Sequence, residues 1–193
     1  MMPYQQIFFY TSLAIFLAVF LIQIFWRKNI FKIIRPLFWV TVFATFGYSF
    51  YISFLQYQAF QSGPLNLILG TSKGLLWFIG YVRLHFWNQF VISLLGALLI
   101  FLFAKYMNKK MGERFFEREE IYIGALGVFL VGYPAWIFYI VLVLLASVIA
   151  SAIFLRKGER MPLYVFWIPA AIITILIVQF WAMHQSWWNS LRF

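Results

Sequence analysis

The chain has 193 residues, of which 65% are hydrophobic, 23% aromatic and only 10% charged. Soluble proteins average roughly 45–50% apolar and about 25% charged residues, so this composition excludes a cytosolic enzyme, a disulfide-stapled secreted domain and a disordered tail. The formal charge of +10 comes from basic residues that lie mostly between apolar runs, where lysine and arginine orient membrane helices. Because no soluble stretch is long enough to present them as one surface, we predict membrane lipids, and not nucleic acid, as partners.

Long apolar runs predict several membrane-spanning helices. A spanning helix needs about 20 apolar residues, since the hydrocarbon core is roughly 30 Å thick. The run over residues 6–26 is too long for a signal-peptide core and lacks a cleavage site, so we expect a retained helix. Further spans are expected at 36–58, where Pro36 opens the helix, and at 86–104, 134–155 and 162–183.

Two segments are weaker candidates for spanning. Residues 63–83 contain several glycines and a proline, which favours a broken, tilted or re-entrant element. Residues 121–131 are too short to cross alone. We therefore predict an all-α polytopic transmembrane bundle of six or seven helices in one domain, residues 1–193, in which residues 1–35 supply an extra N-terminal helix and a short basic loop.

The basic loops leave two topologies open. The loops 105–120 and 156–160 are separated by two spans, so both can face the cytoplasm. Three segments, 36–58, 63–83 and 86–104, lie between the four basic residues of 27–35 and the loop 105–120. These basic residues face outward if all three segments cross the membrane. They face the cytoplasm if 63–83 is re-entrant.

Side chains able to carry out chemistry are few. The chain has no cysteine, which excludes thiolate nucleophiles, cysteine-ligated zinc and iron–sulfur clusters. It also has no aspartate, and its two histidines, His85 and His184, lie beside tryptophans without a second ligand at metal spacing. We interpret both histidines as interfacial residues and predict neither a metal site nor a cofactor.

A basic pattern near the second span has two interpretations. Lys28, Arg35 and Pro36 fit the K-x6-R-P opening motif of membrane phosphatases. The partner motifs are missing, because Pro64 stands where the assisting histidine is needed and His85 is followed by Gln89 instead of an aspartate. Basic residues that border a membrane helix produce the same spacing, and we prefer that interpretation.

The polar loop 111–120 places Glu113, Glu117 and Glu120 at i, i+4 and i+7. The simpler interpretation is an ion-paired surface helix, in which each pair contributes only a few tenths of a kcal/mol. The functional interpretation uses Glu120, because the apolar run begins at the next residue. A carboxylate at that position would lie at the membrane edge and at a helix N-terminus, where the helix dipole favours it and desolvation opposes it.

Four stretches occur in a recognisable order over residues 53–171. They are an apolar run that ends in a polar segment and a proline (54–64), a small-residue helix (91–99), a polar segment followed by an apolar helix with Gly-Tyr (119–134), and two closing helices around a basic loop (144–169). In this order and spacing they resemble the type IV prepilin peptidases, the intramembrane aspartic proteases that trim pilin-like leader peptides.

The resemblance implies positions for a catalytic pair. Alignment on Gly96 and Gly132 places Gln56 and Glu120 where the family has its two aspartates, so the two side chains are expected to converge near the cytosolic border of the bilayer. Binding positions implied by the same alignment are Glu119, Tyr122 and Gly132. A glutamine cannot act as acid or base, and the longer glutamate moves its oxygens by about 1 Å, which impairs catalysis.

The resemblance therefore implies a degenerate member of the family that lacks both catalytic aspartates. The leading prediction is a proteolytically inactive protein of a prokaryotic cytoplasmic membrane that binds a pilin-like transmembrane helix or serves as a membrane subunit of a larger assembly. One alternative is an active, divergent endopeptidase that uses Glu120. The other is a structural membrane subunit unrelated to prepilin processing.

Overall fold

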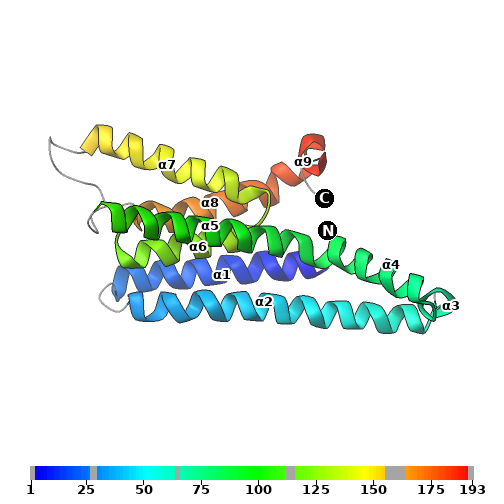
Figure 1. Cartoon of the computed structure of the whole chain (residues 1–193). Helices are drawn as coiled ribbons and strands as arrows, with labels where there is room; N and C mark the ends of the chain where they lie inside the picture. Colours follow the sequence, from blue (N-terminus) through cyan, green and yellow to red (C-terminus); the bar gives the residue numbers. More distant parts are fainter. Residues whose placement is uncertain (1–2, 27–29, 64–65, 112–115, 155–163, 191–193) are drawn as a thin grey trace.

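The computed structural model describes residues 3–26, 30–63, 66–111, 116–154 and 164–190, which form an all-α bundle (Figure 1). Short π and 3-10 turns, Arg83–Trp87 and Ala182–His184, connect some of the helices. The α-helices are α1 (Pro3–Phe25), α2 (Ile30–Gln61), α3 (Asn66–Leu69), α4 (Ser72–Val82), α5 (Asn88–Lys110), α6 (Arg118–Val131), α7 (Ala135–Phe154), α8 (Tyr164–Phe180) and α9 (Ser186–Ser190).

Five helical stretches are long and apolar enough to cross a bilayer. The predicted all-α transmembrane bundle is therefore confirmed, and the chain is an integral membrane protein. The five stretches are Gln6–Phe25, Ile30–Gln61, Ser72–Lys110, Ala135–Ile153 and Val165–His184.

The described part of the segment 63–83, predicted as a broken, tilted or re-entrant element, forms no separate span. After the short helix α3, the Thr71 hydroxyl caps α4 by accepting a hydrogen bond from the Gly74 amide (3.1 Å). The chain then continues through the π turn into α5 as one helical stretch, Ser72–Lys110. The glycines inside this stretch do not interrupt the helix. α2 likewise begins at Ile30, ahead of Pro36, which lies inside the helix.

The continuity of Ser72–Lys110 decides how the charges are distributed. Only two crossings, α2 and α4–α5, separate the start of α2 from the start of α6, so both lie at one end of the bundle, on the left in Figure 1. We call it the basic end. The described basic residues there are Lys32, Arg35, Lys105, Lys109, Lys110 and Arg118.

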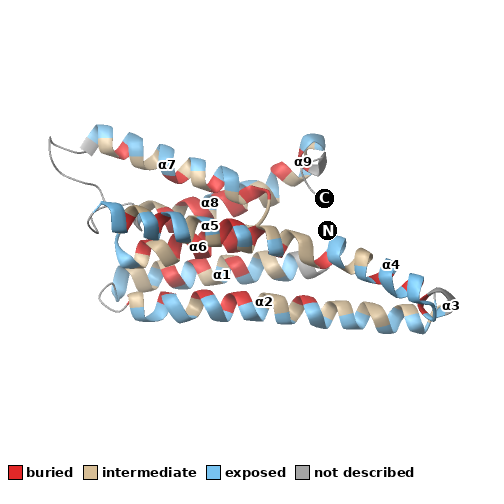
Figure 2. Cartoon of the chain, in the orientation of Figure 1, coloured by how far each residue is buried: buried red, intermediate tan, exposed pale blue. Residues whose placement is uncertain are grey.

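The core of the bundle is α6. Its residues 123–131 are all buried, and it packs against α2, α5, α7 and α8 (Figure 2). Small residues allow aromatic rings to approach its backbone: a Cβ added at Gly124 would meet the Trp167 ring, and one added at Gly127 would collide with Tyr139 Oη. Close contact over small residues is the usual way in which membrane helices associate.

We predict that Gly127→Ala destabilises the protein by about 1–3 kcal/mol, because the added methyl group displaces the fully buried Tyr139 ring. Thermal unfolding in detergent measures the effect. Gly47→Ala is the matched control, since a Cβ at Gly47 meets nothing within 4 Å. Equal midpoints for the two variants would contradict the packing described for α6.

Candidate functional site

The N-terminus of α6 is held to the last turns of α5 by one buried amide. The Asn108 amide nitrogen donates to the Phe116 carbonyl at 2.7 Å, and the Phe116 backbone N–H donates to Asn108 Oδ1 at 2.6 Å. Asn108 is 9% exposed. This two-point contact sets where the chain enters α6, and therefore the depth of Glu119, Glu120 and Tyr122 in the bundle.

Glu120 caps the helix in which it lies. Its Oε2 accepts a hydrogen bond from the Glu117 backbone N–H at 2.8 Å, the contact of a capping box. Its side chain is 2% exposed. The start of α6 therefore supplies a hydrogen-bond partner for this buried carboxyl group.

Glu119 and Tyr122 line an open hollow at the basic end. The Tyr122 ring makes edge contacts with Phe31 of α2 at 6.0 Å and with Phe101 of α5 at 5.2 Å between centroids. Lys105, Lys109 and Arg118 also line the hollow, but Glu120 does not. The predicted positions Glu119 and Tyr122 thus share one surface, while the neighbouring Glu120 is directed into the helix cap.

Gln56 lies far from this surface. Tyr122 contacts Phe31 near the start of α2, and Gln56 follows 25 positions later in the same helix, which at about 1.5 Å per residue is roughly 37 Å. The prediction that Gln56 and Glu120 converge is therefore wrong. Its physical cause is the single crossing Ser72–Lys110 between them, since an odd number of crossings puts the end of α2 and the start of α6 at opposite ends (Figure 1).

Gly132 marks the other end of α6. Its φ of +78° lies in the region that favours glycine, and its N–H donates to the Val128 carbonyl at 3.3 Å. The next residue, Tyr133, donates its backbone N–H to Ser93 Oγ of α5 at 2.8 Å. Gly132 thus shapes the turn between α6 and α7 and is separated from Glu119 and Tyr122 by the length of α6.

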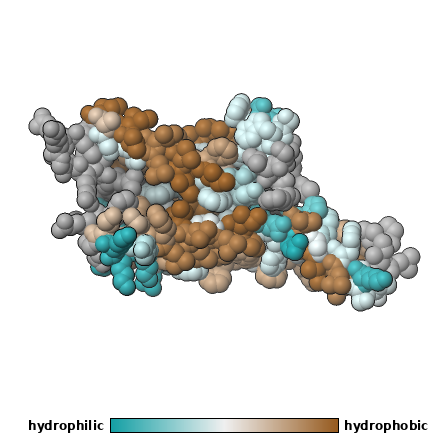
Figure 3. Space-filling view, turned by 45° about the horizontal axis from the view of Figure 1, so that its top comes forward, coloured by the Kyte–Doolittle hydropathy of each residue, from teal (hydrophilic) through white to brown (hydrophobic). Residues whose placement is uncertain are grey.

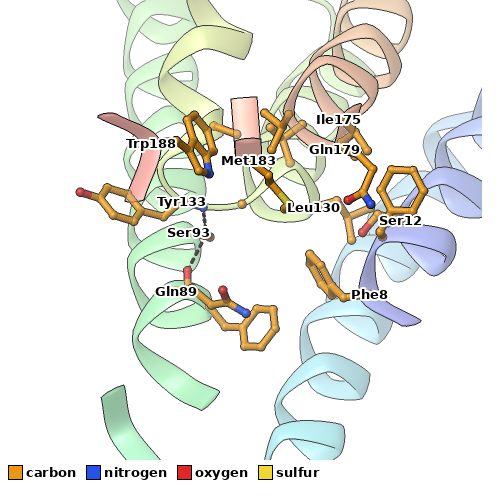
Figure 4. Close-up of a pocket in the computed structure, with 16 residues that line it drawn as sticks. Phe8, Ser12, Gln89, Ser93, Leu130, Tyr133, Ile175, Gln179, Met183 and Trp188 are labelled. Atoms are coloured by element: carbon orange, nitrogen blue, oxygen red, sulfur yellow. Dashed lines mark hydrogen bonds between the residues drawn. The ribbon is translucent and has the colours of Figure 1, made fainter. Parts of the chain in front are cut away.

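A cavity that sequence reasoning missed lies beside this turn (Figure 4). We call it the α1–α8 cavity. Single polar residues within apolar spans, such as Ser12, Gln89 and Gln179, are the signal that could have indicated it, because polar side chains at membrane depth are rare and often functional. Its lining residues are Phe8, Phe9, Ser12, Gln89, Phe90, Ser93, Leu130, Val131, Gly132, Tyr133, Ala135, Ile175, Val178, Gln179, Met183 and Trp188.

No family model, curated protein or solved structure matches the chain. Within the described ranges, no three histidine, aspartate or glutamate side chains gather as a metal site requires. The chemistry available to the molecule follows from its own side chains. An aspartic protease needs two carboxyl groups that share one proton at one water, and here the aligned positions hold a capping carboxylate and a distant amide.

We predict that Glu120→Gln leaves the stability of the protein nearly unchanged, while Glu120→Ala lowers it by about 0.5–2 kcal/mol. Glutamine keeps an oxygen for the Glu117 N–H, as capping boxes allow, and alanine does not. Unfolding in detergent measures both, with Glu119→Ala as the neighbouring control. A loss with Gln as large as with Ala would contradict the capping role.

Proposed function

We propose that this protein is a non-catalytic, multi-pass subunit of a larger membrane assembly, and that it binds its partner through a hairpin outside the bilayer. The hairpin consists of the end of α2, α3, α4 and the π turn, which in the described part of the chain are residues 53–63 and 66–87. The observation that carries the proposal is its length: it extends past the ends of the other helices (Figure 1).

Two helix-length counts, which take Arg35 and Lys105 as one edge of the hydrocarbon core, support a position of the hairpin outside it. From Arg35 at the basic end, about 20 residues of α2, or roughly 30 Å, reach the neighbourhood of residue 55. From Lys105 in the opposite direction along α5, the same length reaches about residue 85. The two points adjoin in space, because the Trp87 Nε1–H donates to Ser53 Oγ at 3.1 Å. Tryptophan is typical of the membrane interface.

Beyond that level the hairpin is held together by aromatic contacts. Tyr57 meets the Phe78 ring at 5.3 Å, and Phe60 stacks on Trp77 at 6.0 Å between centroids. Tyr81 stacks on the His85 ring at 4.2 Å. The pairs Tyr57–Phe78 and Phe60–Trp77 join α2 to α4, and the Tyr81–His85 pair lies within the second arm of the hairpin. These contacts keep the two helices in register, so the hairpin is a preformed arm.

The arm presents apolar side chains that lipid does not cover at this level. Leu75, Leu76 and Ile79 are 46%, 69% and 54% exposed. Figure 3 shows apolar atoms on the arm beside hydrophilic ones, apart from the broad apolar band of the bundle. Exposed apolar clusters rimmed by polar residues mark protein–protein contacts, which supports binding to another membrane subunit or to a pilin-like single-span protein.

The charge distribution supports an orientation. Because lysine and arginine favour cytoplasmic loops, we place the basic end on the cytoplasmic side of a prokaryotic cytoplasmic membrane and the hairpin on the opposite side. The separation of Gln56 from Glu120 speaks against the divergent peptidase, since the peptidase mechanism needs both groups at one water.

The test uses the full tagged chain extracted in mild detergent from membranes of cells that contain the partner. We expect Leu76→Lys combined with Ile79→Lys to dissociate the assembly, so that native electrophoresis shows the free protein, while membrane insertion and unfolding temperature stay unchanged. Both side chains are exposed on the arm, which we place outside the hydrocarbon core.

Leu99→Lys is the matched control, since Leu99 is 66% exposed but lies at bilayer depth on α5. We expect it to impair insertion, at a cost of about 2.5–3.5 kcal/mol for a charge at the centre of a span. The proposed function would be refuted if the assembly survived both hairpin substitutions. It would also be refuted if the wild-type protein extracted from these membranes migrated as a monomer.

A further inference from the structure

The α1–α8 cavity lies near the end of the bundle opposite the basic residues. Its wall is formed by α1, the start of α5, the turn after α6, the end of α8, and α9. Gln89 follows the interfacial Trp87 by two positions. The exposed Trp181 and Trp187 flank the segment that carries Met183, and Trp188 directly follows Trp187. Tryptophan collects at the headgroup level, so the cavity opens at the depth where polar and apolar parts of a lipid meet.

Several buried polar atoms that line this cavity make no hydrogen bond. They are the Ser12 hydroxyl, the Trp188 indole N–H and the Gln179 Oε1 atom, and Ser12 and Trp188 are only 1% and 2% exposed. Figure 4 places Ser12 with Gln179 on one side of the cavity and Trp188 with Gln89 on the other. A buried donor without an acceptor is costly, so the Ser12 and Trp188 donors are both available to a molecule in the cavity.

Ser12 differs in this respect from three other buried hydroxyl groups of the helices. Ser49, Ser93 and Thr174 each donate to the carbonyl four residues earlier in their own helix, at 2.9, 2.6 and 2.7 Å. Ser12 makes no such bond, although serine readily forms one inside a helix. Its hydroxyl hydrogen is therefore available to a bound molecule.

The wall around these groups is fixed before any ligand binds. Ser93 Oγ accepts the Tyr133 N–H at 2.8 Å and donates to the Gln89 carbonyl at 2.6 Å, which ties the α6–α7 turn to α5. The Phe8 and Phe90 rings meet edge to face at 4.9 Å and join α1 to α5. Preformed apolar pockets with a few fixed polar groups are typical of small-ligand sites.

The chemistry of the lining defines the ligand. No described residue of the lining is charged, so an ionised group would be left unpaired at a high cost. The Trp188 N–H can only donate, and the Ser12 hydroxyl can also donate, so the ligand must offer an acceptor oxygen on an apolar body. We infer that the α1–α8 cavity binds an uncharged carbonyl group of a membrane amphiphile, through the Trp188 N–H and the Ser12 hydroxyl. Two sources supply such a group: the acyl ester of a glycerolipid and the ring of a quinone.

The experiment uses the full chain reconstituted in vesicles with one of two photoreactive probes. One is a diacyl phospholipid with a diazirine close to its ester carbonyl, and the other is a short-chain benzoquinone with a diazirine on its tail. After irradiation, mass spectrometry of peptides maps the adducts. We expect adducts on lining residues such as Phe8 and Met183, and the probe that produces them identifies the source.

Matched variants test the two hydrogen bonds. Ser12→Ala and Trp188→Phe each remove one donor and keep most of the side-chain bulk, and we expect each to reduce the labelling of the cavity by roughly fivefold or more. Ser49→Ala and Trp167→Phe remove equally buried groups that do not line the cavity, and we expect them to leave the labelling unchanged.

A competition on the wild-type protein tests the carbonyl itself without any substitution. We expect an unlabelled diester lipid, or the unlabelled quinone, to suppress labelling in a saturable way, and the corresponding diether lipid, which has no carbonyl, not to compete. Three outcomes would overturn the inference: labelling by neither probe, equal suppression by the diester and diether lipids, or full labelling of both folded donor variants. The cavity would then hold only water or non-specific acyl chains.

Discussion

The contact of aromatic rings with the glycines of α6 is the constraint on which the rest of the bundle depends. α6 has no face left for lipid, because Trp167 lies over Gly124, Tyr139 lies over Gly127 and four other helices surround it. A helix of 14 residues is about 21 Å long, too short to reach both sides of the membrane. The residues at both ends of α6 take hydrogen-bond partners from another helix.

α5 supplies a polar side chain at each end of α6. Asn108 binds the chain at Phe116, just before α6, and Ser93 binds it at Tyr133, just after α6. Fifteen positions separate Ser93 from Asn108, which in a helix is about 22 Å and matches the length of α6. Glu120 completes the first of these two ends by capping. Asn108, Ser93 and Glu120 therefore hold a buried helix in position. These three side chains do not form an acid–base pair.

The two ends of the molecule differ in chemistry. The described cations concentrate at the start of α2, the end of α5 and the start of α6, while the opposite end carries an aromatic hairpin and an apolar cavity without charged lining residues. Charge at one end orients a protein in the membrane. The other end is then free to meet lipids and other proteins, which is where we place both the partner surface and the ligand cavity.

The transmembrane character of the chain could be predicted from sequence because each apolar run is long enough to decide it locally. The way in which the chain connects these runs across the membrane could not be predicted from sequence. The glycines at positions 63, 70, 74 and 80 do not decide whether residues 63–83 cross the membrane on their own, and that choice changes the number of crossings by one. That single difference moves Gln56 to the end opposite Glu120. The cavity depended on residues from α1, α5, α8 and α9 whose proximity no local pattern encodes.

The most direct test of the account is the sidedness of residues 56 and 119. The chain has no cysteine, so Gln56→Cys and Glu119→Cys each create a single reactive thiol. In sealed vesicles of known orientation, a membrane-impermeant maleimide added from the outside is predicted to label one of the two variants, and reversal of the orientation is predicted to label the other. Labelling of both variants from the same side would contradict the account, because the two positions would then share one face of the membrane.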